Sequence, residues 1–192
     1  MNSLTEEVYL QRIDKIREKM SKNNLDGYVF FSNRAVNYLT GYRFIPTERP
    51  IALLVTPENI DITVPKLEED AAESESLIDD VYVYYDYPGN NNGDYSHHSS
   101  KTPENMIGKM LEARRLGYIG ADMNGAPGTM GYEGESLGEI TGKAVETHSW
   151  TEDMRIKKSK EEIEVLKKSA KYADRAFERL RQYIEPGRNE VS

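Results

Sequence analysis

The sequence contains no cysteine among its 192 residues, which excludes disulfide bonds and thiolate catalysis. Any metal site would therefore have to use histidine and carboxylate ligands. Basic residues are also scarce, because 25 lysines and arginines stand against 33 acidic residues, a formal net charge of −8. This balance argues against a general nucleic-acid-binding protein, which needs a basic surface for the phosphates.

Long apolar runs are missing as well. No segment approaches the roughly 18 apolar residues that a membrane-spanning helix requires. The first seven residues, MNSLTEE, contain neither a basic nor an apolar leader segment. We therefore expect a cytoplasmic protein that has no membrane partner and no nucleic-acid partner. Its length suits one domain with a sizeable core plus an additional segment.

Familiar catalytic signatures are absent too. There is no His-Glu-x-x-His helix, no Gly-x-Ser-x-Gly elbow and no phosphate-binding loop that ends in Gly-Lys-Ser/Thr. His97 and His98 are adjacent in a polar loop, which rarely holds two metal ligands in place. The glycines of residues 125–134 lack the dinucleotide-binding spacing and indicate a turn. The tyrosines of residues 82–95 lack interleaved basic residues, so they favour a half-buried strand that runs into a loop.

Helical and strand patterns alternate along most of the chain. The patterns predict helices over residues 4–23, 34–40, 67–77, 103–115, 129–139 and 151–156. They predict strands over residues 27–31, 51–55, 60–64, 80–85, 116–121 and 143–147. The strands at 51–55 and 60–64 share a tight turn and must be antiparallel, so we expect an α/β domain with a mixed sheet and helices on both faces. Residues 86–101 are rich in Gly, Asn and Ser, and we expect a long, mobile loop there.

The last forty residues indicate one long helix. Ser159 and Glu162 have the spacing of a capping box, and Pro186-Gly187 ends the helix. Its apolar residues recur at intervals of three and four and form one stripe: Ile163, Leu166, Ala170, Ala173, Phe177, Leu180 and Ile184. A stripe of this length needs a partner surface. Because residues 189–192 read like the start of a further helix, we expect that partner in a second domain of a larger protein.

The segment of residues 37–50 combines aromatic side chains with charges that can pair with carboxylates. It follows the first strand-helix unit as a loop, and loops of this kind often carry binding residues. A binding role and a purely structural turn are both open on physical grounds.

Several features resemble the N-terminal domain of the creatinase/prolidase/aminopeptidase P family. They are the order of elements, the turn Asn37-Tyr38-Leu39-Thr40-Gly41, the strand-to-helix step Val64-Pro65-Lys66-Leu67-Glu68 and the junction that runs from Arg155-Ile156-Lys157 through Glu161-Glu162-Ile163 to Pro186-Gly187 and Glu190. The resemblance covers nearly the whole chain and is weakest over residues 86–150. It implies a ribonuclease H-like N-terminal domain over residues 1–156. Residues 157–192 would then be the first helix of a truncated "pita-bread" catalytic domain.

The resemblance also implies an activity. In the peptidases of this family the pita-bread domain binds two divalent metal ions, usually manganese, cobalt or zinc, through two Asp, one His and two Glu. Two such ions activate a bridging water and polarise the scissile carbonyl, and hydrolysis of Xaa-Pro bonds follows. None of these ligands can be assigned here. The resemblance thus implies no catalytic residue, no metal ligand and no cofactor in this chain, and an inactive fragment.

Candidate substrate-binding residues follow from the same resemblance. In this family the N-terminal domain supports dimer formation, and its loops reach the partner subunit's active site and close the pocket. The candidates in the loop around residues 38–49 are Tyr38, Arg43, Glu48 and Arg49. An arginine there could hold a substrate carboxylate bidentately, and a glutamate could meet a free amino terminus. The alternative for Glu48 and Arg49 is a surface ion pair that contributes about 0–1 kcal/mol.

The expected partners are the chain's own C-terminal catalytic domain, a second copy in a homodimer and a peptide substrate. Two other readings remain open. A non-catalytic relative of creatinase could use this domain for dimerisation or partner binding, and a complete, independent α/β binding module is the third. We expect residues 1–150 to fold alone and the fragment to self-associate through exposed apolar surface.

Overall fold

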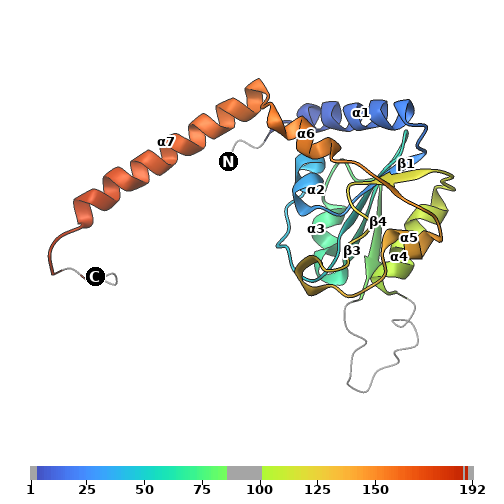
Figure 1. Ribbon diagram of the computed structural model, residues 1–192. Coiled ribbons are helices and arrows are strands. Elements are labelled where there is room, and N and C mark those ends of the chain that lie inside the picture. The colour runs from blue at the N-terminus through green and yellow to red at the C-terminus, as the bar shows by residue number, and fades with distance from the viewer. Residues whose placement is uncertain (1–3, 86–100, 188, 190–192) are drawn as a thin grey trace, which may run out of the picture.

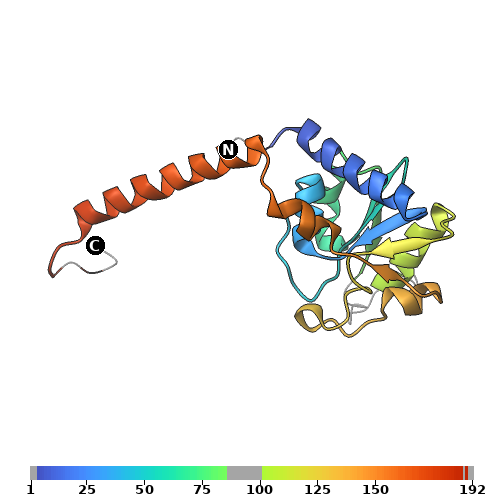
Figure 2. The same ribbon diagram turned by 45° about the horizontal axis from the view of Figure 1, so that its top comes forward.

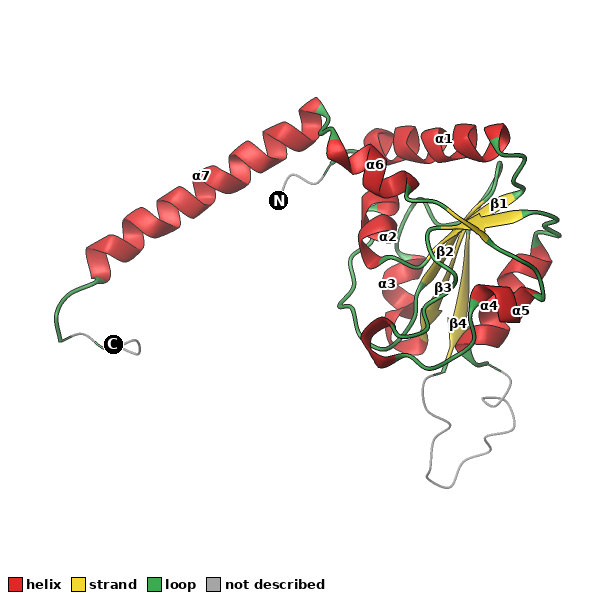
Figure 3. Ribbon diagram, viewed as in Figure 1, coloured by secondary structure: helices red, strands yellow, loops and turns green. Residues whose placement is uncertain are grey.

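A six-stranded mixed sheet lies between two layers of helices, and one long helix projects from the resulting domain (Figures 1 and 2). This computed structural model describes residues 4–85, 101–187 and 189. The strand order is β4-β3-β2-β1-β5-β6. The predicted α/β class, with a mixed sheet and a long C-terminal helix, is confirmed (Figure 3).

The strands are β1 (Gly27–Phe30), β2 (Ala52–Val55), β3 (Ile60–Pro65), β4 (Asp80–Tyr84), β5 (Ile119–Ala121) and β6 (Glu146–Thr147). Strand β2 runs antiparallel to both β1 and β3, as the tight turn between residues 55 and 60 predicts. The pairs β1–β5, β3–β4 and β5–β6 are parallel. All residues of β1, β2 and β3 are buried, because helices cover both faces of the sheet.

The helices of the first layer are α1 (Glu6–Lys22), α2 (Asn33–Thr40), α3 (Glu69–Glu73) and α6 (Trp150–Ile156). Helices α4 (Pro103–Ala113) and α5 (Leu137–Thr141) pack on the opposite face. The first layer contributes Ile13, Ile16, Val36, Leu39, Ala72 and Trp150 to one apolar core. The second layer contributes Ile107, Met110, Leu111 and Leu137 to another. Helices on both faces, as predicted, therefore bury two separate apolar cores.

The helix predicted over residues 129–139 is wrong. A short 3₁₀ turn, Thr129–Gly131, stands there, and α5 starts only at Leu137. The turn is irregular because Met130 and Gly131 within it have positive φ angles of 51° and 90°, and Gly128 just before it has a φ of 77°. Helix α5 can begin only after Ser136, whose side chain forms a capping box with Glu139.

The helix predicted over residues 67–77 is shorter than expected. It opens as a 3₁₀ turn, Lys66–Glu68, and α3 ends at Glu73. The loop predicted over residues 86–101 falls almost wholly outside the described residues, as do His97 and His98 and the last two tyrosines of the cluster, Tyr87 and Tyr95.

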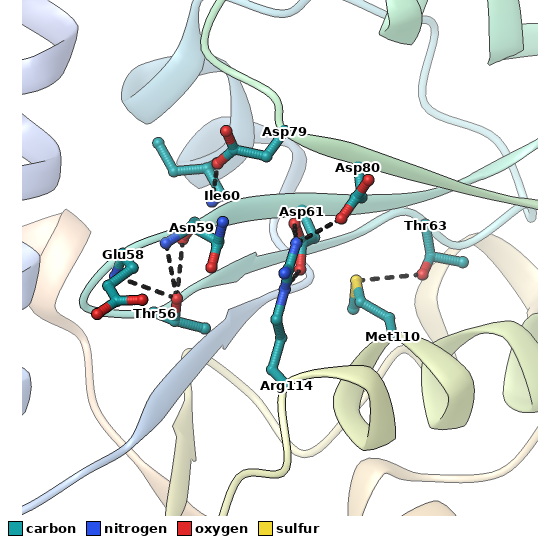
Figure 4. Close-up of polar contacts among 10 residues, drawn as sticks. All are labelled: Thr56, Glu58, Asn59, Ile60, Asp61, Thr63, Asp79, Asp80, Met110 and Arg114. Carbon is teal, nitrogen blue, oxygen red and sulfur yellow. Dashed lines mark hydrogen bonds and ion pairs between the residues drawn. The ribbon is translucent and has the colours of Figure 1, made fainter.

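Arg114 at the end of α4 joins this helix to two strands (Figure 4). Its Nε and Nη2 donate to the two carboxylate oxygens of Asp61 in β3, at 2.6 and 2.7 Å. Its Nη2 also donates to Asp80 in β4, at 2.5 Å. The side chain of Asp61 is 0% exposed, so its charge needs this bidentate partner.

The long helix α7 (Lys160–Tyr183) confirms the strongest helical pattern in the sequence. The Ser159–Glu162 capping box forms as predicted. The helix has no buried residue, and it extends away from the sheet (Figures 1 and 2). Its exposed large apolar side chains are Ile163, Val165, Leu166, Tyr172, Phe177, Leu180 and Tyr183. None of the helices in the described part of the chain is long and apolar enough to cross a bilayer.

Candidate functional site

A cavity of about 310 Å³ lies where α1, α2, α6 and the start of α7 meet. Four arginines contribute to its wall: Arg12, Arg34, Arg43 and Arg155. Tyr38 lines it as well, so the structure brings two of the four predicted binding residues, Tyr38 and Arg43, to the same place. The single carboxylate in this wall, within the described ranges, belongs to Glu162.

Arg12, which lines this cavity, connects three helices. It lies in α1 and is buried, and its Nη1 donates to the carbonyl of Tyr38 in α2 at 2.5 Å. Its guanidinium carbon lies 3.9 Å from the centre of the Tyr38 ring, a close cation–π contact. Its Nη2 is 3.3 Å from Glu162 in the first turn of α7. The sequence pattern did not single out Arg12, although an arginine four residues from both Val8 and Ile16, on the apolar stripe, is a usable signal.

The Asn37–Gly41 motif forms a rigid helix end beside the cavity. The side chain of Asn37 donates to the carbonyls of Gly41 and Tyr42, at 3.3 and 3.0 Å. Gly41 adopts a left-handed φ of 82° and lies against Tyr9, so that an added Cβ would stand 2.9 Å from the Tyr9 ring. Glycine therefore satisfies both the conformation and the close approach. Burial raises the pKa of Tyr38, against the opposing effect of the Arg12 charge.

The loop of residues 43–50 is held at its two ends. At the start, the buried Tyr42 donates its hydroxyl to Glu68 at 3.0 Å, and at the end the carbonyl of Pro50 accepts from Tyr84 at 3.0 Å. Between these anchors, Ile45 is 81% exposed. The loop therefore presents its middle outward from fixed ends.

Glu48 and Arg49 lie further along this loop. Their nearest charged atoms are 4.0 Å apart, so the surface ion pair that was the alternative reading is present at the limit of an ionic contact. Among the described residues that line the cavity, neither of the two occurs. Of the four candidates, two therefore line the cavity and two lie outside it in the loop. Their role in substrate binding stays a prediction.

The usual ligand position of an α/β sheet is filled by the protein itself. Strands β1 and β5 are parallel neighbours, and after them the chain continues into helices on opposite faces of the sheet. Sheets of this kind commonly bind ligands at the carboxyl ends of two such strands. Here the Asp122 carboxylate accepts from the backbone N–H groups of Phe31 and Ser32, at 2.9 and 3.0 Å. Burial raises the pKa of Asp122 to about 6. The sequence analysis did not single out Asp122, although a carboxylate directly after strand β5 was a signal that could have identified it.

Within residues 4–85 and 101–187, no group of three or more His, Cys, Asp or Glu side chains is placed to hold a metal ion. The expectation of two divalent ions concerns an expected catalytic domain outside this chain, and this observation does not test it.

The family described as Creatinase/Prolidase N-terminal domain matches residues 12–156. No curated protein matches the chain at a significant level. The structure is similar to that of the prolidase from Pyrococcus horikoshii OT3, with a TM-score of 0.64 and 25% identity over 94% of this chain and 45% of that one.

Two further structures show the same fold. The Xaa-Pro dipeptidase from Bacillus anthracis has a TM-score of 0.62 and 16% identity over 95% of this chain and 46% of that one. The Creatinase/Prolidase N-terminal domain of an X-PRO dipeptidase from Streptococcus pyogenes has a TM-score of 0.53 and 22% identity over 77% of this chain and 98% of that one. This chain thus spans about half the length of the two larger proteins, 46% and 45%. It belongs to the creatinase/prolidase N-terminal domain family.

Proposed function

We propose that this chain is the accessory N-terminal domain of a metal-dependent Xaa-Pro dipeptidase or aminopeptidase of the cytoplasm. The observation that carries the proposal is the family match over residues 12–156, joined to the fold shared with prolidases. In this proposal the catalytic residues and two divalent ions, manganese, cobalt or zinc, lie in a C-terminal domain that residues 157–192 begin. The accessory domain supports dimer formation and closes the substrate pocket, and alone it hydrolyses nothing.

The exposed apolar side chains of α7 support the proposal of a partner domain. Its large apolar side chains are 38% to 67% exposed, among them Leu166, Phe177 and Leu180. Covering such a stripe stabilises a complex by about 25 cal/mol for each Å² of apolar surface removed from water. The catalytic domain is the partner that we propose for this face.

The loop of residues 43–50 supports the pocket-closing role. It is fixed at Tyr42 and Pro50, while Arg43 and Glu48 are exposed and can meet a peptide's carboxylate and amino terminus. Arg49 carries the planar guanidinium that suits a carboxylate. We therefore keep Tyr38, Arg43, Glu48 and Arg49 as the proposed substrate-facing residues.

The test uses the full-length enzyme with its metal ions. Arg49→Ala and Glu48→Ala should each lower kcat/KM for an Xaa-Pro dipeptide about tenfold, since a hydrogen bond to a charged group contributes roughly 1.5–3 kcal/mol. Longer peptides should become relatively better substrates. Glu58→Ala, an exposed glutamate in the β2–β3 turn, is the matched control. Unchanged kcat/KM and unchanged product length in both variants would reject the pocket-closing role.

A non-catalytic dimerisation or partner-binding module related to creatinase is the second candidate. The observation that favours it is the same uncovered α7 stripe, because two copies of this chain could pair through it. Analytical ultracentrifugation separates the readings. A concentration-dependent dimer that Phe177→Ser abolishes would favour pairing through α7, and a monomer at high concentration would speak against it.

A further inference from the structure

The cavity lined by Arg12, Arg34, Arg43 and Arg155, here called the arginine cavity, contains more positive charge than the carboxylate in its wall neutralises. The chain as a whole has a net charge of −8, yet this wall brings four guanidinium groups together. Its carboxylate, Glu162, is already engaged at both oxygens. Oε1 lies 3.3 Å from Arg12, and Oε2 accepts from the backbone N–H of Ser159 at 2.8 Å.

The other three arginines have no such partner. In the described part of the chain, the guanidinium groups of Arg34, Arg43 and Arg155 form no ion pair and no hydrogen bond, although the backbone carbonyl of Arg155 accepts from Lys158. Of these lining residues, Arg34 and Arg43 are exposed and Arg155 is half-buried. Like charges that line one small space repel each other, and an anion between them removes this repulsion.

Arg12 is a buried part of the cavity wall and is held in place by specific contacts, unlike a surface arginine. Its side chain is 6% exposed, and its position is set by the Tyr38 carbonyl, the Tyr38 ring and Glu162. The cavity's volume, about 310 Å³, is at the lower end of the range for small-molecule sites. Leu4, Tyr9 and Val165 add an apolar wall.

We propose that the arginine cavity binds a phosphate group, either as the free ion or as the monoester of a small molecule. Three uncompensated guanidinium groups suit a ligand that carries about −1.5 to −2 charges at neutral pH. A single carboxylate would leave two of them uncompensated. The planar guanidinium donates two parallel hydrogen bonds to phosphate oxygens, which a lysine cannot do.

Binding at this place has a structural consequence. Arg34 lies in α2 and Arg155 in α6, one short turn before α7 begins. A phosphate that contacts both would tie the junction of α6 and α7 to the sheet domain. The inference rests on the cavity alone and does not depend on the proposed peptidase role, although Tyr38 and Arg43 enter both proposals.

Isothermal titration calorimetry on the 192-residue chain tests the proposal, with inorganic phosphate as the probe and acetate at equal ionic strength as the reference. Arg34→Gln and Arg155→Gln should each weaken phosphate binding roughly tenfold, because each removes a charge-assisted hydrogen bond. Arg175→Gln, an exposed arginine on α7, should bind phosphate like the wild type. Phenyl phosphate distinguishes the two sources, since a monoester that uses the apolar wall should bind more tightly than the free ion.

Two results would overturn the proposal. One is phosphate that binds no more tightly than acetate, and the other is unaltered phosphate binding in Arg34→Gln. Arg34 is exposed and unpaired within the described residues, so this variant retains the fold, and circular dichroism verifies it. Glu48→Ala and Arg49→Ala test the peptidase role at residues outside the cavity wall, so the two proposals fail separately.

Discussion

Replacing Arg114 with methionine should strongly destabilise the domain. Asp61 lies on β3 with a fully buried side chain, and Arg114 holds both of its oxygens at 2.6 and 2.7 Å (Figure 4). Methionine keeps part of the apolar stem of Arg114 but leaves Asp61 as a buried charge without its cation. Asp80, which also contacts Arg114, adds a second negative charge to the same region.

Breaking a buried ion pair from one side destabilises a protein by about 3–5 kcal/mol. Arg114 is 21% and Asp80 58% exposed, so water reaches the outer part of the cluster, and we expect the lower end, about 3 kcal/mol. With a urea m-value of about 2 kcal/mol per M, this corresponds to a fall of about 1.5 M in the unfolding midpoint.

Urea unfolding followed by circular dichroism measures this loss. Arg115→Met is the matched control, because Arg115 is exposed and forms no ion pair with the described residues. Adding Asp61→Asn to Arg114→Met should restore part of the lost free energy, because the buried charge is then gone. A loss below about 1 kcal/mol in Arg114→Met, or a double variant less stable than the single one, would refute the reasoning.

Two further predictions concern stability. Asp122 has its pKa raised from 3.8 to about 6, so its contribution to the free energy of unfolding is fully present below pH 4 and is lost as the pH rises through 6. The difference amounts to about 3 kcal/mol at 1.36 kcal/mol per pKa unit. The stability difference between wild type and Asp122→Asn, from urea unfolding at pH 4 to 7, should follow this titration, and a pH-independent difference would contradict it. Gly41→Ala should lose about 1–2 kcal/mol in the same assay, since alanine strains the left-handed φ of 82° and its Cβ meets Tyr9, and an unchanged midpoint would argue against that strain.

The elements that the sequence predicted well are those with a strong local signal. Helix α7 was predicted from apolar residues at intervals of three and four and from the Ser159–Glu162 capping box. Both signals involve residues that are close together in sequence. The β2–β3 hairpin follows from one tight turn. The helix expected over residues 129–139 does not form, because Met130 and Gly131 adopt positive φ angles that a right-handed helix cannot accommodate.

The candidate site was only partly predictable. Tyr38 and Arg43 became candidates because they lie among the aromatic and charged residues of 37–50 and because the family resemblance implies that this loop closes the substrate pocket. Arg12 and Arg155 reach the same cavity from other helices, and their distance along the chain hides that meeting. Asp122 likewise bonds to Phe31 and Ser32, more than 85 residues away in sequence.

The sequence by itself determined the class of fold, the hairpin, the long helix and its cap, because hydrophobic periodicity and capping act over a few residues. Only the tertiary structure decided which charges meet. Arg114 joins Asp61 across 53 positions, and four arginines from separate segments line one cavity. Such contacts depend on how strands and helices pack, and packing is set by burial of the whole apolar core rather than by any local pattern.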